Sequence, residues 1–144
     1  MASINQITVL LTTANDTGAG TDGYVYLGIA GREFVVARDD VNDTEQGSEH
    51  TYVFGMDANV QGAEFNDPRN PQLKTENLSV YPTYLRFEPE GSASPWHLER
   101  VTVKVNPNGS DGSTFDNMDL LGGAKLWLGQ DYGKMLYLQR QTGS

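Results

Sequence analysis

The sequence predicts an all-β domain, a sandwich of antiparallel strands. Short runs of β-branched and aromatic residues alternate with polar residues at every second position, as in strands with one buried face. Polar turns rich in glycine separate these runs, and the chain contains 16 Gly. No long window shows the 3.6-residue apolar repeat of an amphipathic helix. About eight short strands joined by such turns favour a β-sandwich.

Eight segments in order carry the strand pattern. Residues 7–11 open with β-branched residues, and residues 24–29 place Tyr24 and Tyr26 on the face opposite their aliphatic side chains. The clearest strand is residues 98–105, in which three valines alternate with polar residues. The other expected strands are residues 33–37, 51–54, 83–87, 125–128 and 135–139.

One segment breaks the spacing of the strands. Residues 56–82 are long for a connection and contain three of the six prolines. We therefore expect a single domain over residues 1–144 with a loop insertion at about residues 58–72. Because the cost of closing a loop grows slowly with its length, we expect that this loop can be shortened without unfolding the domain. Four apolar residues are expected to attach the end of the segment to the core: Leu73, Leu78, Val80 and Tyr81.

The composition excludes several functional classes. The chain has 10 Lys and Arg against 19 Asp and Glu, a formal net charge of −9. We therefore expect no nucleic-acid partner, and anionic lipid would repel the chain unless a cation lay between them. The absence of cysteine excludes disulfides, thiolate zinc sites and a cysteine nucleophile.

Targeting and catalytic motifs are missing from the sequence. The first six residues have no basic region and no long apolar stretch follows, so we expect no signal peptide and no transmembrane segment. This favours the cytoplasm or export by a leaderless route. There is no Gly-x-Ser-x-Gly elbow, no P-loop and no His-Glu-x-x-His motif. Without these motifs, we expect no enzymatic activity. His50 and His97 follow no metal-ligand spacing, so we expect them to be surface or hydrogen-bonded histidines.

Three turn segments are rich in acidic and amide side chains: residues 15–23, 39–49 and 106–112. The first two supply the carboxylate, amide and backbone oxygens that calcium prefers. Five acids fall between residues 39 and 49, and their repulsion favours a counter-ion. The alternative is that these segments are solvated hairpin turns, and composition does not decide between the two. The third segment is expected to be a plain turn.

Two stretches resemble the signatures of the PLAT, or lipoxygenase-homology, domain. They are residues 18–29, which read GAGTDGYVYLGI, and residues 95–103, which read PWHLERVTV. The chain is especially similar to the calcium-binding C-terminal domain of the alpha-toxin phospholipases C, which has a comparable Asp/Asn loop ahead of a Thr-Tyr-x-Phe strand. The resemblance covers most of the chain except about residues 58–72.

This resemblance implies an eight-stranded antiparallel β-sandwich of two four-stranded sheets, with a binding role and calcium in loops at one end. It implies seven metal ligands, the first two through backbone oxygens: Gly20, Thr21, Asp22, Asp39, Asp40, Asn42 and Asp43. The toxin domains have an Asp just before the aromatic residue of the second signature, where this chain reads Ser94-Pro95-Trp96. One of the family's sites is therefore expected to be weakened, and the site shared by Asp22 and Asp43 to be intact.

Aromatic residues offer further candidates. Trp96 lies beside the loop end. It would either insert into a membrane or stack on a ligand, or it would pack half-buried against the strand ends. Because Trp is usually well buried, packing is favoured. Tyr24, Tyr26 and Tyr52 would either form a sugar-stacking platform or be covered by neighbours on an outer sheet face, the more common outcome.

The sequence thus predicts a non-catalytic calcium-binding module that binds a membrane lipid surface, with Ca²⁺ bridging the acidic loops and lipid phosphate. One alternative is a protein-interaction or structural module whose loops calcium orders, and another is a carbohydrate-binding module. Loops of weak calcium affinity suit an extracellular setting, despite the missing signal peptide.

Overall fold

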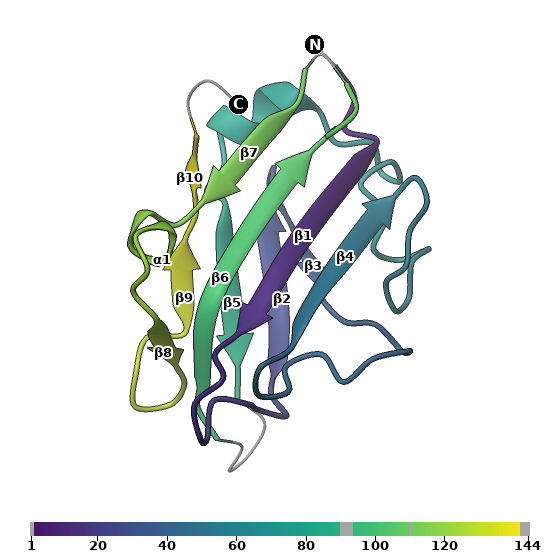
Figure 1. Ribbon diagram of the computed structural model, residues 1–144. Helices are drawn as coiled ribbons and strands as arrows, with labels where there is room; N and C mark the ends of the chain where they lie inside the picture. Colours follow the sequence, from purple (N-terminus) through teal and green to yellow (C-terminus); the bar gives the residue numbers. More distant parts are fainter. Residues whose placement is uncertain (1, 90–93, 110, 142–144) are drawn as a thin grey trace.

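The protein is an antiparallel β-sandwich, seen in a computed structural model that describes residues 2–89, 94–109 and 111–141 (Figure 1). Two sheets form among these residues, one of six strands in the order β10-β7-β6-β1-β4 with β8 also paired to β6, and one of four in the order β3-β2-β5-β9. The strands are β1 (Gln6–Thr13), β2 (Tyr24–Ile29), β3 (Arg32–Val35), β4 (Glu49–Gly55), β5 (Tyr84–Glu88), β6 (Trp96–Val105), β7 (Ser113–Asp116), β8 (Leu126–Leu128), β9 (Met135–Tyr137) and β10 (Gln139–Arg140). The two helices described are short: η1 (Thr75–Ser79) and α1 (Met118–Leu121).

The core follows from the alternation in the central strands. Strand β1 pairs with β4 on one side and β6 on the other, and its residues alternate between partly and fully buried positions. The register sets Ile7 opposite Val105 and Val9 opposite Val103, and all four side chains are fully buried. The four-stranded sheet adds Leu27 of β2, among others, from the facing layer. The all-β sandwich predicted from the sequence is therefore confirmed.

The expected division into two four-stranded sheets needs correction, because two of the strands are interrupted. Strand β1 occupies one edge of β6, so β7 and β8 share the other edge, one at each end of β6 and separated by α1. Strand β9 pairs with β5 and β10 pairs with β7, with only Leu138 between them. The last segment of chain thus passes from one sheet to the other, and the six-stranded sheet arises from these breaks.

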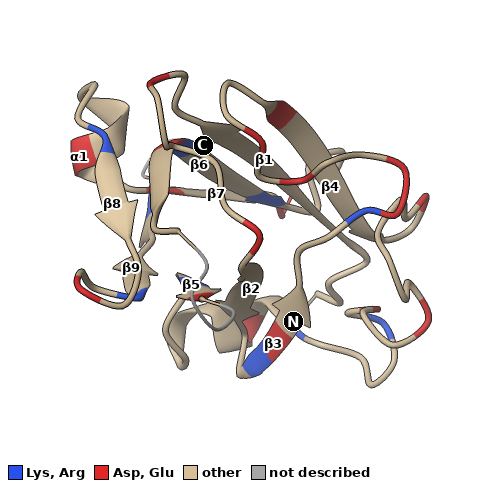
Figure 2. Cartoon of the chain, turned by 90° about the horizontal axis from the view of Figure 1, so that it is seen from below, with Lys and Arg blue, Asp and Glu red and all other residues tan. Residues whose placement is uncertain are grey.

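The connections β1–β2 and β3–β4 lie together at one end of the sandwich, at the bottom of Figure 1. Figure 2 looks onto this end and shows acidic residues along the exposed connections. Strands β1 and β4 belong to the six-stranded sheet, and β2 and β3 belong to the four-stranded sheet. Each of the two connections therefore crosses between the layers. The predicted calcium loops are therefore neighbours, as the resemblance implied.

The segment after β4 is more closely attached to the fold than expected. Strands β3 and β4 each have one neighbour in their sheets. The Asn59 side chain accepts from the backbone N–H of Val53 (2.8 Å) and donates to Thr51 O (3.0 Å), both in β4. The Asn66 side chain accepts from the N–H of Val35 in β3 (3.1 Å). This loop therefore covers one edge of each sheet, which argues against removing it without loss of stability.

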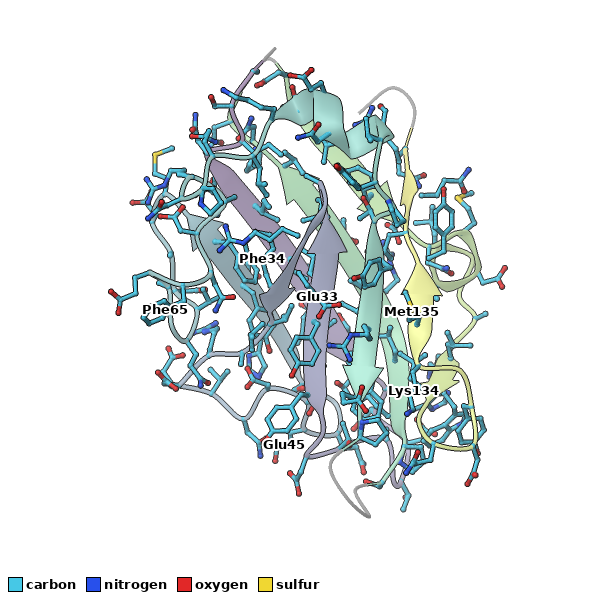
Figure 3. All side chains as sticks on the ribbon, turned by 180° about the vertical axis from the view of Figure 1, so that it is seen from behind. Glu33, Phe34, Glu45, Phe65, Lys134 and Met135 are labelled. Atoms are coloured by element: carbon cyan, nitrogen blue, oxygen red, sulfur yellow. The ribbon has the colours of Figure 1, made fainter. Side chains whose placement is uncertain are left out.

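Burial along the same segment is uneven. Val60, Leu73 and Leu78 belong to the core, which confirms the expected attachment through the two leucines. Val80 is 67% exposed and Tyr81 48%, so the prediction that they join the core was wrong. Figure 3 shows Phe65 pointing outward from the loop, and its side chain is 76% exposed.

The turn after β6, and the absence of long helices in the described part of the chain, bear on two further predictions. The expected turn at residues 106–112 lies partly outside the described residues, but its first residue, the buried Asn106, holds the start of the chain: its side chain accepts from the N–H of Asn5 (2.8 Å) and donates to Ser3 O (2.9 Å). Among the described residues, no helix is long and apolar enough to cross a membrane.

Candidate metal-binding site

Two acidic connections line one pocket at the loop end of the sandwich. Asp22 follows β1 in the first connection, and Asn42 and Asp43 lie between β3 and β4. Together with Thr21 and Thr44 they line a pocket of about 240 Å³. Residues some 20 positions apart in the chain, two of them aspartates and one an asparagine, therefore line one space.

A buried pair of hydrogen bonds joins the two connections. The Thr44 hydroxyl donates to Thr21 O (2.6 Å), and the Thr21 N–H donates to Thr44 O (3.2 Å). Both threonines are buried. Because Asp22 and Asp43 are their immediate chain neighbours, this pair holds together the two backbone positions that carry the aspartates.

The Asp43 carboxylate is held through one of its oxygens. Its Oδ1 accepts from the Tyr52 hydroxyl (2.9 Å) and from the N–H of Arg38 (3.0 Å). No hydrogen bond from the described residues reaches Asp43 Oδ2 or the Asp22 carboxylate. Burial, together with the bond to Asp43, raises the pKa of Tyr52 well above its ordinary value, so the hydroxyl stays protonated and donates.

The other two predicted carboxylates are not in this pocket. Asp40 forms a bidentate pair with the Arg38 guanidinium (2.9 and 2.7 Å), which lowers the pKa of Asp40 below its ordinary value. Asp39 is exposed and does not line the pocket. The structure thus divides the second loop into a part that faces Asp22 and a part that is neutralised by its own arginine.

Gly20, the first predicted ligand, faces a hydroxyl group. Its carbonyl oxygen accepts from Ser94 Oγ (3.0 Å), and Ser94 O accepts in turn from Thr21 Oγ1 (2.7 Å). Asp16, the acid near the start of the loop, is 2.9 Å from His97 Nδ1 through both carboxylate oxygens. This hydrogen bond lowers the pKa of Asp16.

Trp96 is withdrawn as a ligand-binding candidate. Its side chain is 0% exposed, its Nε1–H donates to Thr13 Oγ1 (2.8 Å), and its ring lies 5.7 Å from that of Phe87. The packing alternative is therefore correct, and the burial is complete. A fully buried ring offers no surface for a lipid or a sugar.

The tyrosine platform is also not formed by the three predicted residues. Tyr52 is fully buried, and the Arg86 guanidinium lies over the ring of Tyr26 at 4.2 Å from its centroid. Only Tyr24 keeps about half of its surface exposed. The carbohydrate-binding alternative therefore loses the sequence feature that suggested it.

The pocket fits calcium in donor type but not as a closed cage. Within the described ranges, no three His, Cys, Asp or Glu side chains come together to hold a metal ion. Asp22, Asp43 and Asn42 supply hard oxygen donors, and Ca²⁺ takes about six to eight of these. Water or a ligand would have to supply the remaining positions.

Sequence reasoning missed the residues that shape the pocket. Thr44, Tyr52 and Ser94 all contact the predicted ligands, but none carries a charge that would mark it. The available signal was position, because Thr44 follows Asp43 directly. The partner of its hydroxyl lies 23 residues away and becomes evident only when the two connections meet.

The sequence as a whole places the chain in a known family. The PLAT/LH2 domain model matches residues 7–125, so the chain belongs to the PLAT/LH2 family. No curated protein matches it.

Solved structures with the same fold include two toxins and a lipoxygenase. The alpha toxin of Clostridium absonum is 22% identical with a TM-score of 0.59, and the Clostridium perfringens alpha-toxin of avian strain SWCP is 19% identical with a TM-score of 0.60. The match covers 95% and 96% of this chain but 32% of each toxin. Coral 8R-lipoxygenase is 17% identical with a TM-score of 0.54, covering 94% of this chain and 17% of that enzyme. The chain thus spans about a third of the toxins and less of the lipoxygenase, and these identities support the fold alone.

Proposed function

We propose that this chain is a non-catalytic calcium-binding module that binds membrane lipid surfaces when calcium is present. The observation that carries the proposal is the placement of Asp22 and Asp43, from separate connections, on one pocket at the loop end. Both carboxylates keep oxygens that no described residue engages.

The residues that would hold the ion follow from the pocket. Asp22, Asp43 Oδ2 and the Asn42 side-chain oxygen would be its ligands, while Tyr52 and Arg38 hold the other oxygen of Asp43. A bound Ca²⁺ would supply positive charge and open coordination positions for phosphate oxygens. The two carboxylates would neutralise part of that charge.

Charge supplies the second argument. A chain with a net charge of −9 is repelled by an anionic surface, so direct attraction is unfavourable. Calcium held between the carboxylates and lipid phosphates would reverse this locally. The description of coral 8R-lipoxygenase, which refers to calcium activation through a C2-like domain, is consistent with such a role in a protein of the same fold. A site of weak affinity would suit an extracellular setting.

Vesicle sedimentation tests the proposal. The protein is mixed with phosphatidylserine–phosphatidylcholine vesicles in calcium, magnesium or chelator, and we expect co-sedimentation in calcium only. Asp22→Asn and Asp43→Asn should abolish it. Glu45→Gln, in the same acidic loop but outside the pocket, is the matched control and should sediment as wild type. Equal sedimentation in calcium and chelator would contradict the proposal.

A second candidate function is a protein-interaction module whose loops are ordered by calcium. It is supported by exposed apolar residues on α1, β8 and β9. These three elements lie along one side of the molecule in Figures 1 and 2. The exposed residues are Met118, Leu121, Leu126, Met135 and Tyr137. Calcium binding without any vesicle sedimentation would favour this candidate over the first.

A further inference from the structure

Three segments at the loop end are joined by hydroxyl groups. Ser94 Oγ donates to Gly20 O (3.0 Å), and Thr21 Oγ1 donates back to Ser94 O (2.7 Å). Thr44 Oγ1 donates to Thr21 O (2.6 Å) from the third segment. The first connection is therefore tied both to the segment before β6 and to the connection before β4.

These bonds use the protons that the hydroxyls have. Thr21 Oγ1 donates its proton to Ser94 O and accepts from the N–H of Gly23 (3.2 Å), so both of its roles are filled. Ser94 is the position near which the resemblance implied an acid. A carboxylate there would face the Gly20 carbonyl without a proton to donate, so the direct bond would be lost and a cation would be favoured between the two acceptors.

No neighbouring carboxylate among the described residues requires a cation beside the Gly20 carbonyl. Asp16, the other acid at the start of the first connection, pairs with His97 and not with Gly20. The close approach of the connections also leaves little space, since a Cβ built on Gly20 would lie 2.9 Å from the backbone nitrogen of Gln46. The oxygens at this position are two carbonyls, of Gly20 and Ser94, and two hydroxyls, of Ser94 and Thr21, and each carbonyl already accepts from one hydroxyl.

We infer that the Ser94–Gly20–Thr21 hydrogen bonds take the place of a metal ion at this position. Among the described residues this leaves a single metal position, at Asp22 and Asp43, and the first connection is fixed to Ser94, just before β6, without any ion. That one calcium ion binds at Asp22 and Asp43 rests on the proposed function. That Ser94 joins the first connection to the segment before β6 without a metal ion does not rest on it.

Two measurements on three variants test the inference. Calorimetric titration of wild type should give one Ca²⁺ per chain. Ser94→Asp exchanges the donor for a carboxylate, so we expect one additional Ca²⁺ per chain. Ser94→Asn is the matched neutral variant of the same size and should keep the wild-type count. In chelator, Ser94→Ala should lower the melting temperature by roughly 2–5 °C, as for the loss of one hydrogen bond.

The outcomes separate the inference from the function it rests on. Two ions bound by wild type, or an unchanged melt of Ser94→Ala in chelator, would overturn the inference. A folded Ser94→Asp that gains no ion over wild type would overturn it as well. If wild type binds no calcium at all, the proposed function fails, while a lowered melt of Ser94→Ala and an ion gained by Ser94→Asp still support the joint.

Discussion

The hydroxyl of Tyr52, on a ring buried in the core, donates to Oδ1 of Asp43 over 2.9 Å. Asp43 lies in a partly exposed connection, so the core determines which way this carboxylate turns. Tyr52 belongs to β4, next to the central strand β1. The position of the candidate ligand is thereby linked to the packing of the sandwich.

Tyr52→Phe should weaken calcium binding while keeping the ring in the core. The free energy of unfolding should fall by about 1 kcal/mol, as for one lost hydrogen bond. Calcium affinity should fall roughly tenfold, because a group that orients a ligand is lost. Titration calorimetry and urea unfolding measure the two effects. Tyr132→Phe, on an exposed ring, is the control, and equal affinity in both variants would show that Tyr52 does not orient Asp43.

Asp22→Asn and Asp43→Asn should lower calcium affinity at least about tenfold, since affinity depends on the number of charged ligands. The chelator-treated fold should remain intact and its stability equal or slightly higher, because one source of repulsion is removed. Calorimetric titration measures the calcium affinity and thermal melts measure the stability, with Glu45→Gln as the control. If the melts of both variants change equally with and without calcium, the aspartates only shape turns.

Calcium should raise the melting temperature, and magnesium should do so much less. Ca²⁺ accepts irregular sets of oxygen ligands, whereas Mg²⁺ requires a tight octahedron. At free calcium about 100 times Kd, the stabilisation should approach 2.7 kcal/mol. Differential scanning calorimetry in calcium, magnesium and chelator provides the measurement. Identical melts in all three would leave the pocket without a metal role.

The loop after β4 should be needed for stability. Asn66→Ala removes the acceptor for the N–H of Val35 and should cost about 1–3 kcal/mol, since the side chain is buried. Asn59→Ala, at an exposed position, should cost about 0.5–1.5 kcal/mol. Asn108→Ala, in the exposed turn after β6, should stay within about 0.5 kcal/mol. Urea unfolding gives all three values, and wild-type stability after deletion of residues 58–72 would refute the edge-covering role.

The outer face of the four-stranded sheet should contribute a pH-dependent stability. The Arg86 guanidinium pairs with both oxygens of Glu33 (3.0 and 2.8 Å) and lowers the pKa of Glu33. Figure 3 shows Glu33 on this face. Since the folded pKa lies below the ordinary value of about 4.3, the contribution is present above that pH and is lost as pH falls through the folded pKa.

Glu33→Gln should therefore cost about 0.5–1 kcal/mol at neutral pH, with the difference from wild type shrinking as the pH falls below about 4. Thermal melts across this pH range measure the effect. Glu64→Gln, on an exposed acid, is the control and should follow wild type. A constant difference between Glu33→Gln and wild type at all pH values would mean that charge at Glu33 is not what stabilises this face.

Most of the strands could be predicted because they carry a period of two. Residues 24–29 match β2 in full, and the valine alternation marks most of β6. Strand β7 was missed because Phe115 is the one apolar residue of its four, too little to show a pattern. The break between β7 and β8 depends on α1, which is a single turn long.

The site was predictable only in part, for a related reason. Asp22, Asn42 and Asp43 reach one pocket because both connections lie at the same end of the sandwich. Asp40 does not, because Arg38 lies two residues away and takes its carboxylate. The spacing of charged residues along the sequence does not predict the direction in which a long side chain points within a turn. The contact of Ser94 with Gly20 spans 74 residues, so it required the folded chain.

The loop after β4 also changes how this molecule meets its own copies. The edge strand of a sheet presents unpaired N–H and C=O groups onto which another chain can add a strand. Here Asn59 and Asn66 bond such groups in β4 and β3, on both layers of the same side of the sandwich. We therefore expect a variant that lacks these amides to expose templates for edge-to-edge polymerisation and to lose solubility at high concentration.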